Sequence, residues 1–570
     1  MKKYVLILAV SLSGTLGTFA QENCLVGNEA PLRLMHAELK RGFKTFKKVR
    51  PPIYYLSYVY EDKKVLGLTV EQDGVSEHKD TYSTLVVSAR AGSPQLDNTR
   101  PLKGEYDPEA RMLTYTENIN PFAKDDLSFR LALWRTTQKA VEKAQEQFSR
   151  VQTNVQTTAQ RQDNSNDFVV PPVSLFCHTQ ELVTFDTAKI SQWLTRASAL
   201  TRGKAFVQNS HFSFHVEQGH RYFVDSQGTQ LKTPFLLARL SYFVENQLPD
   251  GSWLERYNAY DVTEESQLPS EEDFLAAVKQ SLDELEALSV APEAQPITVP
   301  AILKNRAMAV FVHEVLGHRV EGHRQKLDSF GKTFTSKVGQ LVTAPFITIV
   351  DDATLRSFHG IPLRGFYEYD DEGVQARPVM LIEKGVLKGF LMSSSPIEGF
   401  NHSNGHGRGA VDRWPVARMG VTRLIADKTV SYPELEQQLL QEIRAQEKPY
   451  GYIIEDLSGG FTMTDTDMPQ VFKLEPKLVF RVYPDGRKEV VRGADIVGTP
   501  LVSFGQILAA ADDYDVFNGS CGAESGWVPV SAIAPSVLLK SLEIEKTAKS
   551  EGKPPILPAP YSLPNKGERK

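Results

Sequence analysis

Two histidines bracket a glutamate near the middle of the chain, in the stretch His313-Glu314-Val315-Leu316-Gly317-His318. Imidazole is a good neutral ligand for zinc, and a carboxylate next to a ligand can act as a general base without binding the metal. The motif is therefore suggestive of a zinc site. On this motif alone an alternative stays open, in which the two histidines lie at a helix end in a polar patch.

The spacing of the two histidines restricts the local backbone. The most common zinc-peptidase helix places its histidines four residues apart, whereas His313 and His318 are five apart. At about 100° per residue their rings would lie roughly 140° apart on a regular helix. The preceding stretch 301–312 is largely apolar, without Pro or Gly, and predicts a buried helix. We expect this helix to bulge or to end near Gly317.

The chain has only three cysteines, Cys24, Cys177 and Cys521. Two histidines and one cysteine make a workable zinc shell that leaves a fourth position for water. Cys521 lies between Gly519 and Gly522, which permit the close backbone approach that a ligand loop often needs. From spacing alone, Cys521 fits equally well as the third ligand or as a small buried hydrophobic residue.

Further motifs follow the histidine pair in a fixed order, and the whole series is HEVLGHRVEG (313–322), IVDD (349–352), YDDEG (369–373), IEKGVLKG (382–389), GHGR (405–408), GG (459–460), CG (521–522) and VPV (528–530). From about residue 300 to 545 this order and spacing resemble the TldD/PmbA family of metallopeptidases, specifically its active TldD-like branch. The resemblance implies Zn²⁺ bound by His313, His318 and Cys521, with Glu314 as catalytic base. The N-terminal half resembles the family only weakly, mainly through its long polar helix.

Three other groups are candidates for contacts with substrate. Arg408 is a candidate to stabilise the oxyanion, with a surface arginine as the alternative. We interpret His406 as a loop or cleft residue and not as part of a second metal site. Gly459 and Gly460 precede an alternating stretch, where an exposed strand edge would pair with an extended peptide. The alternative is a strand buried inside a sheet.

The leading functional hypothesis is a zinc-dependent peptidase that hydrolyses peptide bonds of unfolded proteins or peptides. The alternative is a non-catalytic peptide-binding or assembly subunit of a TldD/PmbA-like complex. Glu314 and the three ligands favour the enzyme, as does the lack of a convincing fourth ligand, since structural zinc sites are normally closed. The resemblance implies two-subunit particles with an enclosed site, either a homodimer or a heterodimer with a related chain.

The first twenty residues predict export. Lys2 and Lys3 precede an apolar run, and a signal-peptide cut after Ala20 is plausible. The protein is then periplasmic or secreted, where Cys24 and Cys177 could pair. No later run is apolar and long enough for a membrane span, so none is expected after the signal is removed. The net charge of −6 gives no reason to expect nucleic acid as a partner.

The predicted fold class is α+β. After the signal peptide 1–20, an N-terminal α/β domain with long helices covers 21–291. A C-terminal metallopeptidase domain at 292–548 is mostly antiparallel β and carries the zinc helix, and 549–570 is a disordered tail. The prolines between 292 and 300 mark the boundary. The long helix from 127 to about 160 is apolar early and then polar, so we expect its second half to project into solvent or to meet a second chain.

Overall fold

The computed structural model describes residues 22–23, 26–71, 74–102, 114–119, 126–157, 163–326, 332–462, 464 and 471–549. The predicted signal peptide, Cys24 and the predicted tail beyond Lys549 lie outside these residues. Within the described ranges, no helix combines the length and apolar character that a membrane crossing requires.

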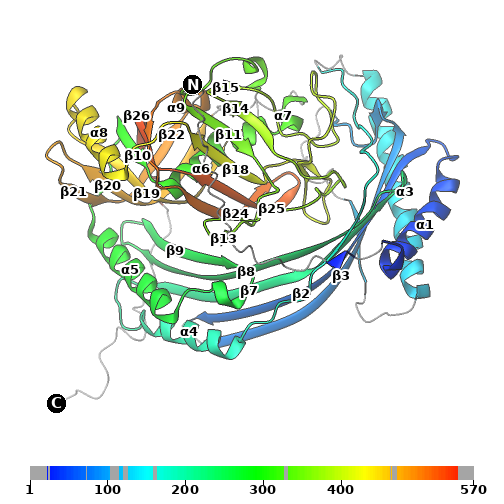
Figure 1. Ribbon diagram of the computed structural model, residues 1–570, viewed down its shortest axis with the longest axis horizontal. Coiled ribbons are helices and arrows are strands. Elements are labelled where there is room, and N and C mark those ends of the chain that lie inside the picture. Colours follow the sequence, from blue (N-terminus) through cyan, green and yellow to red (C-terminus); the bar gives the residue numbers. More distant parts are fainter. Residues whose placement is uncertain are drawn as a thin grey trace, which may run out of the picture.

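A curved nine-stranded sheet dominates the N-terminal part of the molecule (Figure 1). Its strand order is β1-β6-β8-β7-β2-β3-β4, with β9 paired to β8 and β5 paired to β3. Residues 53–71 form one continuous strand, and β3 and β7 pair with it along most of its length. The strands are β1 (Glu22–Asn23), β2 (Ile53–Glu71), β3 (Gly74–Ser93), β4 (Leu96–Asp97), β5 (Tyr115–Ile119), β6 (Leu175–Thr179), β7 (Asn209–Asp225), β8 (Gln230–Gln247) and β9 (Trp253–Val262).

Helices cover the convex face of this sheet, and its concave face is turned toward the C-terminal half (Figure 1). On β7 the alternate side chains of Phe212, Phe214 and Val216 are buried in one core cluster with residues of α4 and α5. The predicted long helix that begins at 127 is confirmed as α3. The four helices are α1 (Ala30–Phe46), α3 (Asp126–Thr157), α4 (Thr187–Ala199) and α5 (Glu271–Val290), and short 3-10 turns lie at Val26–Asn28 and Glu265–Gln267.

The expectation that the second half of α3 projects into solvent is wrong. Its Ala140, Val141, Ala144, Phe148 and Val151 side chains are buried, and a Cβ added at Gly92 of β3 would lie 2.5 Å from the Phe148 ring. Small side chains let α3 approach the sheet closely, so a few apolar residues suffice. The exposed large apolar residues of α3 lie mainly in its first turns, at Leu127, Leu131 and Trp134, with Val155 near its end.

The C-terminal half contains two larger sheets that are mostly antiparallel, as predicted. In the first, β10 pairs with both β19 and β26, so that β10-β19-β20-β22-β26 closes on itself. Its strands are β10 (Ile297–Leu303), β19 (Gly451–Thr462), β20 (Phe472–Val482), β21 (Lys488–Val491), β22 (Ala494–Gly498), β23 (Ile507–Ala510) and β26 (Val537–Lys546).

The second sheet has the order β15-β14-β11-β18-β25-β24, and β24 is its edge strand. Its strands are β11 (Ile347–Asp351), β14 (Val379–Glu383), β15 (Val386–Leu387), β18 (Val421–Ala426), β24 (Asp515–Ala523) and β25 (Gly526–Ala534). Two small ladders complete the β-structure, β12 (Ser357–Phe358) with β13 (Ile361–Pro362) and β16 (Gly407–Arg408) with β17 (Val416–Ala417).

Helix α6 (Asn305–Val315) lies between the two sheets and contacts strands of both (Figure 1). Every residue of α6 from Ala307 to Val315 is buried, so the predicted buried helix is confirmed. Its predicted start is wrong, because residues 301–303 belong to β10, which pairs on both sides. The other helices of this half are α7 (Gly322–Lys326), α8 (Tyr432–Ala445) and α9 (Pro500–Phe504), with a 3-10 turn at Thr335–Lys337; α8 was not predicted.

The N- and C-terminal halves meet through charged contacts. Arg256 of β9 binds Glu284 of α5 and Asp456 of β19 at 2.7 and 3.0 Å, and Arg221 of β7 binds Asp371 at 2.7 Å. Helix α5 ends at Val290 and β10 begins at Ile297, and the domain boundary at 292 stays a prediction.

Candidate metal centre

His313, His318 and Cys521 form a buried group in which one ligand atom from each lies within 4.8 Å of the other two. Cys521 Sγ is 3.2 Å from His313 Nε2 and 3.3 Å from His318 Nε2. The two imidazole rings are nearly perpendicular, with centroids 5.1 Å apart. The three side chains predicted from the sequence are therefore brought together by the fold, from segments about two hundred residues apart.

The end of α6 resolves the five-residue spacing of the histidines. The helix stops at Val315, and a 3-10 turn covers Gly317–Val320. Because the pitch changes here, the His318 and His313 rings both face Cys521. The prediction that the helix ends near Gly317 is confirmed. A Cβ on Gly317 would lie 2.0 Å from Met419 Sδ, so only glycine lets the turn pass this buried side chain.

Cys521 reaches the group from a β-hairpin. It lies on β24 opposite Val528 of β25, and Cys521, Val528 and Val530 form a small buried cluster. The adjacent Gly522 is covered by the Trp527 indole, which a Cβ at that position would approach to 3.0 Å. Cys521 is a free thiol, whereas Cys177 is disulfide-bonded.

The electrostatics of the group favour a thiolate. Burial acts to raise the pKa of the Cys521 thiol, but His318 and His313 outweigh it and hold that pKa well below its ordinary value. Burial acts to lower the pKa of both imidazoles, and the Cys521 sulfur outweighs it and raises the pKa of His313 and His318. A thiolate is the form in which a cysteine binds a metal, whereas an imidazole binds one only after its ring nitrogen has lost the proton.

The group fits zinc. With Zn–S near 2.3 Å and Zn–N near 2.0 Å, tetrahedral zinc places its sulfur and nitrogen ligands roughly 3.5 Å apart. The observed 3.2 and 3.3 Å separations are close to this value. No fourth His, Cys, Asp or Glu of the described ranges belongs to the group. His323, the nearest candidate in sequence, contacts Glu524 instead.

Glu314 lies beside the group without being part of it. Its Oε2 is 4.0 Å from His318 Nε2, and the residue is buried. Burial raises the pKa of Glu314, and the two histidines oppose this only in part. The carboxylate is thus near the ligands and partly shielded from water, as a general base would be.

The glycine pair of β19 lies next to Glu314. A Cβ on Gly460 would be 2.2 Å from Leu474 Cδ2 and 3.4 Å from Glu314 Cγ, so the strand passes close to this side chain. A Cβ on Gly459 would meet no atom within 4 Å. Of the two predicted glycines, Gly460 therefore packs against the catalytic candidate and Gly459 faces open space.

His406 and Arg408 are held by other partners. His406 is fully buried, and its Nε2 lies 3.1 Å from Asp351 Oδ1. Arg408 donates from Nη1 to the Met419 carbonyl at 2.6 Å, and its guanidinium stacks 4.7 Å from the Tyr367 ring centroid. An oxyanion role for Arg408 stays a prediction that requires these contacts to rearrange.

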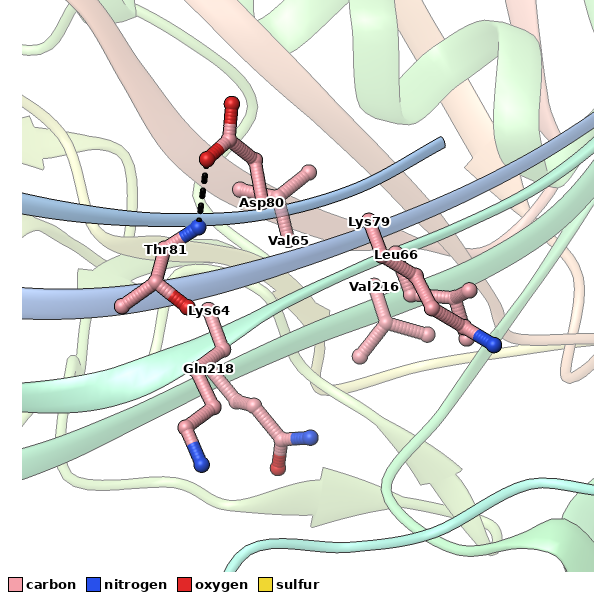
Figure 2. A pocket seen from close by; sticks show the side chains of 8 residues that line it. All are labelled: Lys64, Val65, Leu66, Lys79, Asp80, Thr81, Val216 and Gln218. Carbon is pink, nitrogen blue, oxygen red and sulfur yellow. Dashed lines mark hydrogen bonds between the residues drawn. The ribbon is translucent and has the colours of Figure 1, made fainter. Parts of the chain in front are cut away.

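A separate hollow of about 450 Å³ lies on the N-terminal sheet, over β2, β3 and β7 (Figure 2). No histidine, cysteine or residue of the metal group lines it. Its lining residues are Lys64, Val65, Leu66, Lys79, Asp80, Thr81, Val216 and Gln218. We assign no chemistry to this hollow.

Comparison with known proteins finds similarity in the C-terminal half of the chain, which contains the His/His/Cys group. Residues 296–546 match the model of the PmbA/TldA metallopeptidase C-terminal domain. A metalloprotease TldD homolog of Haemophilus influenzae is 28% identical over 275 residues, 48% of this chain and 52% of the relative. A zinc metalloprotease TldD homolog of Saccharolobus solfataricus is 24% identical over 247 residues, 43% of this chain and 51% of the relative. The chain thus spans about half the length of these relatives.

The fold extends the similarity beyond that half. The crystal structure of TldE from Thermococcus kodakarensis superimposes with a TM-score of 0.57 at 15% identity, covering 91% of this chain and 100% of TldE. At this identity the superposition shows a shared fold alone. Residues 296–546 are therefore a PmbA/TldA metallopeptidase C-terminal domain, and the chain as a whole shares the fold of TldE.

Proposed function

We propose that this chain is an active zinc peptidase that hydrolyses peptide bonds of unfolded proteins or peptides. One observation carries the proposal: a buried His/His/Cys group that no fourth His, Cys, Asp or Glu of the described residues joins, with a buried carboxylate beside it. One relative carries zinc in its name, and the donor set and spacing here suit zinc. His313, His318 and Cys521 would hold the metal.

Zinc, when bound, supplies the Lewis acidity that activates water and polarises a peptide carbonyl. Glu314 accepts the proton of the attacking water and passes it to the leaving amine. Burial of this carboxyl raises its pKa toward the range in which a group exchanges protons near neutrality. His313 and His318 would bind zinc through Nε2, the ring nitrogen that lies near Cys521 Sγ in each.

The edge of β19 supports an extended substrate. On one side β10 pairs only with residues 452–454 of β19, and on the other side β20 pairs as far as Thr462. The part of β19 that contains Gly459 therefore has backbone groups without a strand partner on the β10 side among the described strands. A peptide that pairs there by backbone hydrogen bonds would be bound with little regard to its side chains.

Glu314→Gln tests the enzymatic role directly. The amide keeps the shape of the side chain but cannot accept a proton, so we expect zinc and fold to be retained while cleavage of an unfolded protein falls by at least roughly 100-fold. Zinc content, circular dichroism and the cleavage rate are measured on the same preparation. Undiminished cleavage, or loss of zinc from the variant, would contradict this role. Absence of any cleavage by the wild-type protein would favour a peptide-binding subunit.

A further inference from the structure

We propose that Glu321, Arg324, Arg418 and Glu524 form a positioning network that holds His318 and Cys521 in their metal-binding geometry. The network joins the segment that carries His318 to the hairpin that carries Cys521. This inference rests on the proposed zinc site. It assigns a role to Glu321, which has none in the motif 313–322, and to three residues outside the quoted motifs.

Glu321 is the centre of the network. Its carboxylate is fully buried, and its Oε2 lies 3.2 Å from His318 Nδ1, the ring nitrogen opposite the one that faces Cys521. A carboxylate in this position fixes both the orientation and the tautomer of a metal-binding imidazole. By contrast, His313 Nδ1 has no hydrogen-bond partner in the described part of the chain, and the rigid helix α6 holds this residue.

Two buried arginines connect Glu321 to the cysteine hairpin. Arg324 donates from Nε to Glu321 Oε2 at 2.8 Å and from Nη2 to Glu524 Oε2 at 2.9 Å. Glu524 follows Cys521 by three residues, beyond the end of β24. The planar guanidinium therefore spans the two ligand-bearing segments.

Arg418 makes the second connection, on the side of the Cys521 backbone. Its Nε is 3.4 Å from Glu321 Oε1, and its Nη2 donates to the Cys521 carbonyl at 2.7 Å. Its Nη1 donates to Ser525 Oγ and to the Gly526 carbonyl at the hairpin turn, at 2.9 and 3.1 Å. Because Arg418 is fully buried, these contacts are shielded from water and ionic screening.

The need for such a network follows from the elements that carry these ligands. His318 lies in a single 3-10 turn, and Cys521 lies near the end of an edge strand. Neither element is rigid in the way that α6 is. Two arginines that meet on one carboxylate tie these two ligands together across 203 residues of chain.

Zinc affinity is the measurement that tests the network, by competition with a chelator at one fixed pH. We expect Glu321→Gln to weaken zinc binding by roughly 10- to 100-fold, as is typical for loss of a group that supports a metal ligand. With Co²⁺ in place of zinc, the absorption bands that report ligand geometry should shift in the variant. Arg324→Lys keeps the positive charge but loses the planar guanidinium that donates to both Glu321 and Glu524. We therefore expect it to weaken zinc binding less than Glu321→Gln does.

A matched control separates positioning from general stability. Arg256 is also buried and also bridges two carboxylates, Glu284 and Asp456. Arg256→Met should lower the thermal midpoint and leave the zinc affinity and the Co²⁺ spectrum unchanged. If Glu321→Gln does not fold, Arg324→Lys gives the decisive comparison with this control.

The outcomes distinguish this inference from the proposed function. A wild-type protein that binds no zinc would overturn both. A wild-type protein that binds zinc, with variants whose affinity and Co²⁺ spectrum equal its own, would overturn the network alone. Weakened binding that occurs equally in Arg256→Met would also overturn it, because the effect would then be one of stability.

Discussion

Gly317 shows how one residue permits the chemistry of this centre. A regular helix would keep His313 and His318 well apart in angle, and the chain needs a sharp turn between them. Glycine allows that turn to pass Met419, with which any Cβ would collide. With this turn in place, Glu314 Oε2 lies 4.0 Å from His318 Nε2, so the carboxylate is next to the His/His/Cys group without belonging to it.

Cys521→Ser is the most informative change among the ligands. A hydroxyl is a much poorer zinc ligand than a thiolate, and the two histidines alone would leave half of a tetrahedral shell unfilled. We expect elemental analysis to find close to one zinc per wild-type chain and far less in the variant. Equal zinc content in the two proteins would remove Cys521 from the site.

Sequence patterns predicted the three side chains that the fold brings together, but not the charged residues that contact them. His313, Glu314 and His318 form a short motif, and Cys521 stands out as one of three cysteines. Arg418 and Glu524, in contrast, are ordinary charged residues whose role depends on long-range contacts that no local pattern encodes. The sequence did contain one sign of such a network, the high density of acidic and basic residues in 319–324. Charged side chains that follow a buried helix need partners of opposite charge.

At the scale of elements, strand β19 positions the site from the side opposite the cysteine hairpin. Gly460 packs against Leu474 and approaches Glu314, whereas its neighbour Gly459 faces open space. The strand and α6 therefore hold the Glu314 carboxylate between them.

Gly460→Ala should disturb this arrangement. The new methyl group would collide with the buried Leu474, at a cost of about 1–3 kcal/mol in the free energy of unfolding, and would push β19 away from Glu314. We expect reduced cleavage with zinc retained. Gly459→Ala is the matched control for stability and should leave the thermal midpoint unchanged, because no atom lies within 4 Å of the added methyl group. Equal rates for both variants and the wild type would show that β19 does not position Glu314.

Helices and strands were predicted correctly where apolar residues recur with a clear period. They were predicted wrongly where pairing with distant strands determines the secondary structure. The long helix α3 and the strands of the curved sheet followed their residue patterns. Residues 301–303 read as the start of a helix because they are apolar, yet they pair with β19 and β26. The burial of the second half of α3 was missed because alanines count little in an apolar pattern although they pack closely on a sheet.

At the scale of the whole molecule, the curved sheet and the C-terminal half face one another, and charged pairs such as Arg256–Asp456 join them (Figure 1). We propose that the protein is exported to the periplasm or secreted. We also propose that it works as at least a dimer, with a second copy or with a related inactive chain. The support for the dimer is the family resemblance, since the burial of α3 removes the argument drawn from its polar second half.

An enclosed site in such a dimer predicts a preference for unfolded substrates. A stably folded protein should be cleaved slowly or not at all, and the same protein after unfolding should be cleaved faster, because only an extended chain reaches the β19 edge. Light scattering of the active protein should give a mass well above the 63.7 kDa of one chain. A single-chain mass for fully active protein would exclude a required dimer, and equal cleavage of folded and unfolded forms would argue against an enclosed site.

The central claim is an open, catalytic zinc site, and anomalous diffraction at the zinc edge from crystals of the purified protein tests it most directly. We predict one zinc peak bonded by His313 Nε2, His318 Nε2 and Cys521 Sγ, with Glu314 outside the shell and the fourth position free of protein. Absence of a peak between these three side chains, or a fourth protein ligand that closes the shell, would contradict the account.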